Sequence, residues 1–285
     1  MTQKKTIFIA GNELANKAIS QLETPIKKAA ALKPGLAIIQ VGDDPASTLY
    51  VEKKIAACKA IGINTFSFKF SVNSGEHEII NKIIVLNSQD DVHGIMVQLP
   101  LPKPLSSFSV CNSIAPSKDV DGLTATNIGK LALGQPQFIP ATVKAIIHII
   151  EHIKLCLRGL NVVIIGNSNI IGKPLALLMA NALATVTICH KESYDIATKV
   201  KAADIVVSAI GKRNIIQAEW IQEKAVVIDV GIIREKDTVY GDIDSSKVIC
   251  KAITPVPGGV GPLTIAMLMQ NTMIAYNNTI RPYAK

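Results

Sequence analysis

Aromatic residues are scarce in this chain. They make up 4% of its 285 residues, with a single tryptophan, although the hydrophobic fraction is 48%. The apolar content therefore rests on Ile, Val, Leu and Ala, a composition typical of parallel strands that helices bury on both faces. We expect an α/β fold, and the length is sufficient for two buried cores.

Cysteine is also sparse. The five cysteines are odd in number and scattered, with no CxxC pair and no histidines at zinc-ligand spacing. This pattern argues against a disulfide framework and a metal site, and it is typical of a reducing compartment. We expect a cytoplasmic protein that holds no metal.

Long apolar runs and basic runs are missing as well. The first apolar run is too short for a secretory signal, and VKAIIHIIEHIKLCL is interrupted by polar residues long before the roughly 20 apolar residues that span a bilayer. The formal net charge is +8, but no basic run alternates with aromatic residues as in strand-binding grooves. We therefore expect no membrane span and no nucleic-acid partner, and we interpret the lysines as a solvated surface.

Apolar runs and helical segments alternate along the chain. From Gly35, the runs GLAIIQVG, INTFSFKF and HGIMVQLPL predict strands, and LYVEKKIAACKAIG and EHEIINKIIVLNS predict the helices between them. A helix at about 141–156 precedes further strands at NVVIIG, TVTICH, DIVVSAIG and AVVIDVG, a series that implies a parallel sheet. A last helix is predicted at LTIAMLMQNTMIAYNN. The sequence thus predicts an α/β domain over 1–139, completed by the last helix within 262–285, and a second domain with a parallel sheet over 140–261.

A glycine-containing turn follows the strand NVVIIG. It has the spacing GxSxxxG and leads into a helix with proline in its first turn. Backbone N–H groups and the positive end of a helix bind phosphate at such a turn, as in the first βα turn of a Rossmann unit. We assign Gly166, Ser168 and Gly172 to this turn. The alternative is that the glycines only permit a tight strand-to-helix connection.

The end of the next strand indicates which coenzyme is bound. In a Rossmann unit an acidic residue at this point binds the ribose of NAD, whereas cations suit the extra phosphate of NADP. TVTICH ends in His190 and Lys191, and the first acidic residue, Glu192, comes late. This order favours NADP, with Lys191 as a phosphate ligand. The alternative is that Lys191 is a surface cation.

Tyr50 and Lys54 form the candidate chemical pair. They are four residues apart on a predicted helix, so their side chains project from the same face, which Lys53 does not share. A lysine can act as an acid or base near neutral pH if desolvation lowers its pKa. Short-chain dehydrogenases also use Tyr-x-x-x-Lys, but there the pair follows the coenzyme glycines, and here it precedes them. The alternative is a solvated helix surface.

Three further segments have the character of site loops. In GIMVQLPLP, Gln98 is a polar residue among apolar ones, next to Val97 and Leu99. Asp119 and Asp121 lie in KDVDGL, in an irregular connection where carboxylates commonly cap turns. Glycines and prolines crowd TPVPGGVGPLT, where the backbone can approach a ligand closely. Each segment, taken alone, is either a ligand contact or a structural feature.

The chain resembles the bifunctional methylenetetrahydrofolate dehydrogenase/methenyltetrahydrofolate cyclohydrolase family. The resemblance runs from about Gly35 to Tyr276, in the order VGDDPASTLYVEKK, GIMVQLPLP, KDVDGL, GNSNIIGKPLA, TVTICH, VVIDVGI and ITPVPGGVGPLTIAML. It implies a catalytic domain with an inserted Rossmann domain, a folate cleft between them, and a homodimer. It also implies NADP-dependent oxidation of 5,10-methylenetetrahydrofolate and hydrolysis of the product to 10-formyltetrahydrofolate, which supports purine, methionine and formyl-group biosynthesis.

The resemblance also implies roles for individual residues. Lys54 corresponds to the catalytic lysine, and Gln98 supports it. Tyr50 packs on the folate ring system, and Asp121 anchors the pterin. Further folate contacts are expected at Val97, Leu99, Pro257, Gly258 and Gly259, and NADP contacts at Gly166, Asn167, Ser168, Gly172, Lys191 and Ile232.

Three positions depart from the family pattern. Asn167 stands where the family often has Arg, which can meet the extra phosphate of NADP, so coenzyme preference depends on whether Lys191 compensates. The family's PCTP segment reads PATV at residues 140–143, and Ile233 replaces the usual Asn after DVGI. The last two changes do not touch the proposed proton chemistry, so we expect both activities. The alternatives are a dehydrogenase without cyclohydrolase activity and a catalytically silent NADP-binding protein.

Overall fold

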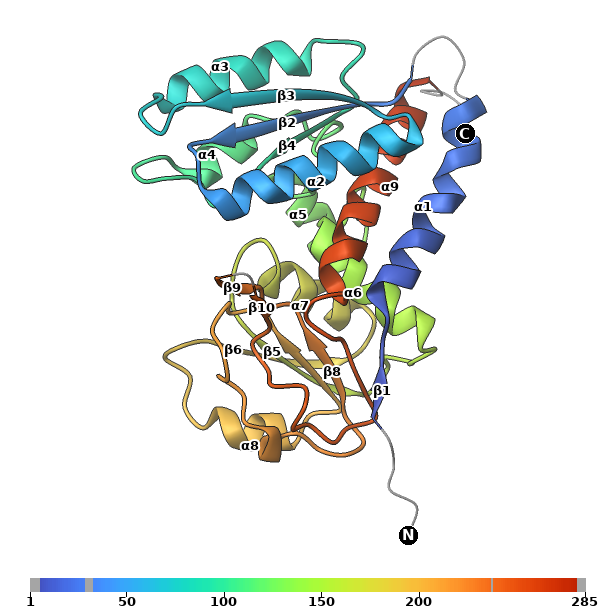
Figure 1. Ribbon diagram of the computed structural model, residues 1–285, viewed down its shortest axis with the longest axis vertical. Coiled ribbons are helices and arrows are strands. Elements are labelled where there is room, and N and C mark those ends of the chain that lie inside the picture. The colour runs from blue at the N-terminus through green and yellow to red at the C-terminus, as the bar shows by residue number, and fades with distance from the viewer. Residues whose placement is uncertain (1–5, 29–32, 237, 281–285) are drawn as a thin grey trace. The chain divides into compact units, whose positions relative to one another are not determined.

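The computed structural model describes residues 6–28, 33–236 and 238–280, and these form two compact units (Figure 1). One unit contains the chain up to Asn16 and Thr142–Thr264. The other contains Lys17–Ala141 and the chain from Ile265 onward. We call them the six-stranded unit and the three-stranded unit, after the main sheet that each contains among the described residues.

The three-stranded unit is built around a parallel sheet with the order β3-β2-β4. Every residue of the central strand β2 is buried, which explains its unbroken apolar run. The strands are β2 (Gly35–Val41), β3 (Asn64–Phe70) and β4 (Gly94–Val97), and the helices are α2 (Pro45–Ile61), α3 (Glu76–Asn87), α4 (Ser107–Asn112) and α5 (Ala125–Ala132).

The last helix, α9 (Val260–Ile280), contributes most of its length to the three-stranded unit. Asn271 Nδ2 on this helix donates hydrogen bonds to Val120 O at 2.8 Å and to Ile139 O at 2.9 Å. The Tyr276 ring meets the buried His93 edge-on, with the ring centroids 4.9 Å apart. The prediction that the C-terminal helix returns to the first α/β layer is therefore confirmed.

The six-stranded unit contains a parallel sheet with the order β1-β11-β8-β7-β5-β6 (Figure 1). Its strands are β1 (Ile7–Phe8), β5 (Asn161–Ile165), β6 (Thr185–Cys189), β7 (Ile205–Ser208), β8 (Val226–Asp229) and β11 (Ala252–Ile253). A separate antiparallel hairpin consists of β9 (Ile233–Glu235) and β10 (Thr238–Tyr240). The helices that complete the order are α6 (Ala141–His152), α7 (Gly172–Asn181), α8 (Ile196–Lys201) and the 3₁₀ turn η1 (Ala218–Trp220).

The α/β fold class predicted from the sequence is confirmed, whereas several elements begin or end elsewhere. The helix α2 begins at Pro45, four residues before the predicted LYVEKK, because the Asp44 carboxylate accepts a hydrogen bond from Ser47 N at 2.8 Å and caps the helix. The strand β4 ends at Val97, so Gln98 lies just beyond it. The pairing of β1 with β11 was not predicted, because a two-residue strand carries no periodic pattern.

The helix α1 (Gly11–Lys28) connects the two units along the chain. Among the described helices, none combines the length and apolar character needed to cross a membrane. The described residues also contain no group of three or more His, Cys, Asp or Glu side chains that could hold a metal ion.

Candidate active site

The beginning of α2 is anchored to β2 by a buried amide. Gln40 Nε2 donates hydrogen bonds to Thr48 Oγ1 at 2.7 Å and to Gly42 O at 3.1 Å. Together with the cap at its first turn, this contact fixes the start of the helix at the carboxyl end of a parallel strand, the usual place for ligands in α/β sheets. Tyr50 and Lys54 follow within the next two turns.

Lys54 is held by the amide of Gln98. Its Nζ donates a hydrogen bond to Gln98 Oε1 at 2.9 Å. The amide is itself oriented, because Gln98 Nε2 donates to Leu99 O at 3.0 Å and Gln98 N donates to Ile39 O at 2.8 Å. The single carbonyl of the Gln98 side chain therefore faces the lysine, and the pairing predicted from the resemblance has a physical basis.

Asp121 is the charged group that acts on Lys54. Burial lowers the pKa of the Lys54 ammonium, and the charge of Asp121 opposes this shift. Burial likewise raises the pKa of the Asp121 carboxyl, and the Lys54 charge opposes that shift in turn. The structure thus brings Lys54, Gln98 and Asp121 together as a half-buried cluster in which a proton on the lysine is less firmly held than on an exposed lysine.

Asp119 has a different environment from Asp121. Its buried carboxylate accepts hydrogen bonds from Leu123 N at 3.1 Å, Thr124 N at 2.8 Å and Asn127 Nδ2 at 2.8 Å. These bonds tie the loop to the start of α5. Asp119 is therefore the turn-capping carboxylate of KDVDGL, whereas Asp121 is only partly buried and accepts a backbone hydrogen bond from Ala141.

Tyr50 lies one turn before Lys54 on α2 and is half-buried. Burial raises the pKa of its phenol, so the hydroxyl stays protonated at neutral pH. The Lys53 ammonium lies 5.9 Å from the centroid of the Tyr50 ring. Val97 is 2% exposed and belongs to the core, whereas Leu99 is partly exposed.

Cys58 also belongs to this region, and sequence reasoning missed it. It lies four residues after Lys54 on α2 and is fully buried. Burial raises the pKa of its thiol to about 12, and the Lys54 charge opposes the shift. The thiol is therefore neutral and packs beneath the lysine as a small apolar group. The spacing from Tyr50 through Lys54 to Cys58 was the available signal.

The glycine turn after β5 leaves no room for side chains at two positions. Gly166 has φ of +127°, and a Cβ there would lie 2.5 Å from Ala209 O. A Cβ at Gly172 would collide with Gly166 O. Ser168 Oγ accepts a hydrogen bond from Ile171 N at 3.2 Å and so stabilises the entry to α7. The main chain is therefore close-packed at the positive end of this helix.

The other predicted coenzyme residues follow the carboxyl ends of neighbouring parallel strands. Asn167 comes after β5, Lys191 after β6 and Ile232 after β8, and all three are exposed. The carboxyl ends of parallel strands lie at one edge of a sheet. The Lys191 ammonium lies 3.6 Å from Glu192 Oε1, and its side chain is 90% exposed.

Pro257, Gly258 and Gly259 lie in the six-stranded unit, between β11 and α9. Gly258 has φ of +98°, and its carbonyl accepts a hydrogen bond from Asn12 N at 3.1 Å. A Cβ at Gly259 would lie 2.5 Å from Pro255 O. The left-handed backbone conformation favours glycine at position 258, and the close backbone approach requires it at position 259. The predicted folate residues are thus divided, with Tyr50, Lys54, Gln98 and Asp121 in the three-stranded unit.

The fold and the site define a class of protein. A parallel sheet with a close-packed glycine turn at the start of a helix is the architecture of a dinucleotide-binding unit. The second α/β unit carries a lysine, an amide and a carboxylate arranged for proton chemistry. The protein is a coenzyme-dependent α/β enzyme.

Comparison with known families identifies the particular one. Residues 140–280 match the tetrahydrofolate dehydrogenase/cyclohydrolase NAD(P)-binding domain, and residues 9–121 match the catalytic domain of the same family. The chain belongs to the tetrahydrofolate dehydrogenase/cyclohydrolase family. The resemblance seen in the sequence is confirmed, and the predicted dehydrogenase and cyclohydrolase functions are those for which the family is named.

Individual relatives match nearly the whole chain. The bifunctional protein FolD of Polynucleobacter asymbioticus is 44% identical over 280 residues, which cover 96% of this chain and 99% of that protein. The FolD methylenetetrahydrofolate dehydrogenase/cyclohydrolase structure from Campylobacter jejuni has a TM-score of 0.93 at 38% identity, covering 96% of this chain and 100% of that one. The Trypanosoma brucei FolD structure, complexed with NADP and an inhibitor, has a TM-score of 0.93 at 34% identity, covering 97% and 99%.

Proposed function

We propose that this enzyme oxidises 5,10-methylenetetrahydrofolate to 5,10-methenyltetrahydrofolate with NADP and then hydrolyses the product to 10-formyltetrahydrofolate. The observation that carries the proposal is the 2.9 Å hydrogen bond from Lys54 Nζ to Gln98 Oε1, beside Asp121. These residues lie within or next to the segment that matches the family's catalytic domain. The Trypanosoma brucei relative was solved with NADP.

The residues of the six-stranded unit fit a dinucleotide. Gly166 and Gly172 lie at the two ends of a turn at the positive end of α7, and a Cβ at either position would collide with main chain. Backbone N–H groups of this turn would hold a pyrophosphate. The exposed Lys191 offers a cation for the extra phosphate of NADP, which supports NADP over NAD although Asn167 brings no charge. The bound coenzyme supplies the hydride acceptor.

Positioning is the main demand of the oxidation step. The nitrogen lone pairs of the folate stabilise the cation that forms, so the enzyme contributes orientation more than base strength. In our proposal the Tyr50 ring packs on the folate ring system. The Asp121 carboxylate accepts two parallel N–H donors from the amino-pyrimidine edge, and these bonds favour the ionised carboxylate against the effect of its burial.

Hydrolysis adds a demand for proton transfer. Water attacks the methenyl carbon and loses both of its protons as the formyl C=O forms. One proton reaches the folate nitrogen as its bond to that carbon breaks, and the other is released to solvent. Lys54 suits this exchange because burial lowers its pKa and Gln98 fixes the position of its Nζ. We therefore assign proton handling to Lys54 and orientation of the lysine to Gln98.

The decisive experiment compares Lys54→Gln with Lys59→Gln. The Lys54 variant keeps much of the side chain's reach but cannot cycle a proton, so cyclohydrolase activity should fall on the order of a hundredfold or more. Dehydrogenase activity should survive better. Lys59 is exposed on α2 and serves as the matched control, with both activities expected to stay near wild type. The assay follows the absorbance of methenyl-folate as it forms with NADP and then disappears once the coenzyme is removed.

Three outcomes would overturn parts of the proposal. Full hydrolysis by Lys54→Gln would rule out proton handling by this lysine. Equal loss of both activities would make Lys54 a positioning residue. No absorbance change in either step for the wild-type protein would leave only a coenzyme-binding protein.

The resemblance implies other properties that stay predictions. These are the division into domains, 1–139 with 262–285 and 140–261, and the homodimer. The cytoplasmic location, which the cysteine pattern predicts, also stays a prediction. Sedimentation velocity of the purified protein tests the homodimer directly, because a sedimentation coefficient matching a single chain of 30.5 kDa would contradict it.

A further inference from the structure

Two buried carboxylates lie close together in the six-stranded unit and have no role in the chemistry above. Asp229 is the last residue of β8 and is 2% exposed, and Asp242 follows β10 and is fully buried. We call them the carboxylate pair. Burying a carboxylate raises the free energy of the folded state unless hydrogen bonds compensate for the loss of water. The hydrogen-bond partners of each carboxylate therefore indicate which part of the structure it stabilises.

Asp242 binds the chain that follows β7. Its Oδ2 accepts hydrogen bonds from Ser208 Oγ at 2.7 Å and from Ile210 N at 2.9 Å. Its Oδ1 accepts a hydrogen bond from Lys212 N at 2.9 Å. One carboxylate therefore fixes the end of the strand and two backbone positions of the loop beyond it.

Asp229 binds the chain that follows β8. Its Oδ1 accepts hydrogen bonds from Gly231 N at 2.9 Å and Asp242 N at 3.1 Å, and its Oδ2 accepts one from Ile243 N at 2.9 Å. Its own backbone N donates to Thr254 Oγ1 at 2.8 Å, immediately after β11. The pair therefore connects the carboxyl ends of β7, β8 and β11, which are neighbours in the sheet.

Glycines beside the pair allow this close packing. A Cβ at Gly231 would collide with the Asp242 carboxylate, and a Cβ at Gly241 would collide with the Asp229 carboxylate. Each carboxylate thus occupies the space that a side chain would need on the opposite segment. The segments held in this way lead directly to Ile232, an expected NADP contact, and to the Pro257–Gly258–Gly259 segment.

We propose that Asp229 and Asp242 are positioning residues that hold the loops after β7 and β8 in the shape required for coenzyme binding. The inference deepens the proposed function and rests on it. Neither carboxylate needs to touch the coenzyme, because each acts through backbone N–H groups of the loops. Burial and the charge of Asp242 also raise the pKa of Asp229 to about 7, which shows how closely the two acidic groups are packed.

The site requires a carboxylate at position 242 and not merely a polar side chain of the same size. An asparagine has one oxygen and one NH₂ group, so either orientation of its amide would place N–H donors against Ile210 N or Lys212 N. Asp242→Asn should therefore disturb the loop after β7 with little change in side-chain volume. Ser208→Ala is a milder variant, because it removes a single donor and leaves both backbone N–H groups bonded to the carboxylate.

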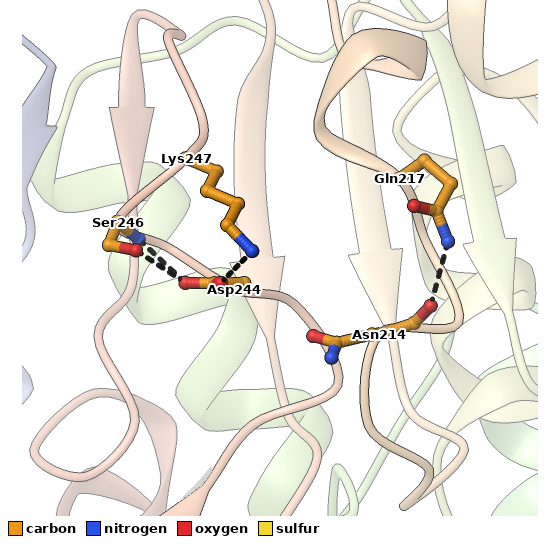
Figure 2. Close-up of polar contacts among 5 residues, drawn as sticks. All are labelled: Asn214, Gln217, Asp244, Ser246 and Lys247. Carbon is orange, nitrogen blue, oxygen red and sulfur yellow. Dashed lines mark hydrogen bonds and ion pairs between the residues drawn. The ribbon is translucent and has the colours of Figure 1, made fainter.

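A matched control lies two residues beyond Asp242. Figure 2 shows that the Asp244 carboxylate accepts hydrogen bonds from the backbone and hydroxyl of Ser246 and pairs with Lys247, at 3.0 Å from Nζ to Oδ2. These contacts are local to the 244–247 turn and do not involve the loops after β7 or β8. Asp244→Asn therefore removes a hydrogen-bonded carboxylate from the same segment without altering the carboxylate pair.

The experiment measures NADP binding by titration calorimetry, the KM for NADP, and thermal unfolding for each variant. Asp242→Asn should weaken NADP binding about tenfold or more and raise the KM for NADP, since it disrupts hydrogen bonds to a buried charged group. Its hydrolysis of preformed methenyl-folate should stay within about twofold of wild type. Ser208→Ala should show a smaller loss of NADP affinity, and Asp244→Asn should bind NADP as the wild type does.

The results separate this inference from the proposed function. Unchanged NADP affinity in folded Asp242→Asn would overturn the inference, and so would equal loss of coenzyme binding and hydrolysis together with a collapsed unfolding temperature. If Asp242→Asn does not fold, Ser208→Ala decides, and unchanged affinity in that variant would overturn the inference. Failure of the folate reactions in the wild-type protein would overturn the proposed function, while NADP affinity would still test the carboxylate pair.

Discussion

Asp119 and Asp121 are separated by one residue, but the interactions of their carboxylates differ. The Asp119 carboxylate accepts hydrogen bonds from the backbone N–H groups of Leu123 and Thr124, whereas the Asp121 carboxylate interacts electrostatically with Lys54. Asp121→Ala should therefore weaken folate binding about tenfold or more and leave NADP binding intact. Asp119→Ala should lower the free energy of unfolding by about 1–3 kcal/mol, since it leaves buried donors without partners. Unaltered folate affinity in Asp121→Ala would contradict the assignment.

Asp229 gives a prediction about pH. Its pKa rises from an ordinary value of 3.8 to about 7 in the folded protein, because it is buried near Asp242. The folded state therefore binds more protons than the unfolded state between these values, and its contribution to stability is lost as the pH rises towards 7. The loss is on the order of a few kcal/mol.

Chemical denaturation of wild type and Asp229→Asn at pH 5 and pH 8 tests this prediction. The variant cannot titrate at this position, so the wild type should lose more stability than the variant between the two pH values. Parallel changes in the two proteins would show that Asp229 does not titrate in this range.

At single residues, sequence reasoning singled out side chains whose spacing or polarity stood out. Tyr50 and Lys54 were paired by helical spacing, and Gln98 was conspicuous among apolar neighbours. Without the family resemblance, the pattern of the sequence does not distinguish Asp119 from Asp121, because both lie in one irregular loop and their hydrogen bonds depend on the folded main chain. Asp229 and Asp242 were missed because their burial depends on strands brought together from distant parts of the chain. The adjacent glycines were their only local signal.

The glycine turn between β5 and α7 has no space for a side chain at Gly166 or Gly172. A side chain at Gly172 would collide with Gly166 O, so Gly172→Ala should displace the start of α7 and weaken NADP binding about tenfold or more. Hydrolysis of preformed methenyl-folate should persist. Gly129→Ala on α5 is the control, because a Cβ there meets nothing within 4 Å. Equilibrium titration with NADP checks both variants, and equal affinities would show that the turn tolerates a side chain.

Elements with unbroken apolar runs were the easiest to predict. The runs at β2, β5, β7 and β8 are buried strands, close to the residues expected, and the run at β6 is a partly exposed edge strand. Boundaries were less accurate, because caps and neighbouring strands determine them. The start of α2 depends on the Asp44 cap, and β4 ends where Gln98 takes up its contacts. The hairpin β9–β10 was not anticipated, since each of its strands spans three residues.

Across the whole molecule, the chain passes from one unit to the other within three helices. The divisions fall after Asn16 in α1, after Ala141 in α6 and after Thr264 in α9. Each unit is therefore assembled from two separated parts of the chain. This organisation explains why contacts such as those of Asn271 join residues more than a hundred positions apart.

A substitution at Asn271 tests how much these long-range hydrogen bonds contribute to the free energy of unfolding. Asn271→Leu should lower the free energy of unfolding by about 2 kcal/mol or more, because the buried carbonyls of Val120 and Ile139 lose a donor. Asn277→Leu on the exposed side of the same helix should have little effect. Urea denaturation of both variants gives the comparison, and equal stabilities would mean that the packing of α9 does not depend on these bonds.

The position of α9 has a consequence for biosynthesis. Among the described elements this helix is the last to leave the ribosome, yet its buried face completes the unit that begins with Lys17. The strands β2, β3 and β4 are thus made early and must wait for their covering helix while the six-stranded unit is translated. Partly covered apolar surface in a nascent chain promotes aggregation. Cells should therefore tolerate slow translation of the segment between β4 and α9 less well than slow translation of the segment before β2, a difference that a folding reporter can measure when stall sites are placed in each segment.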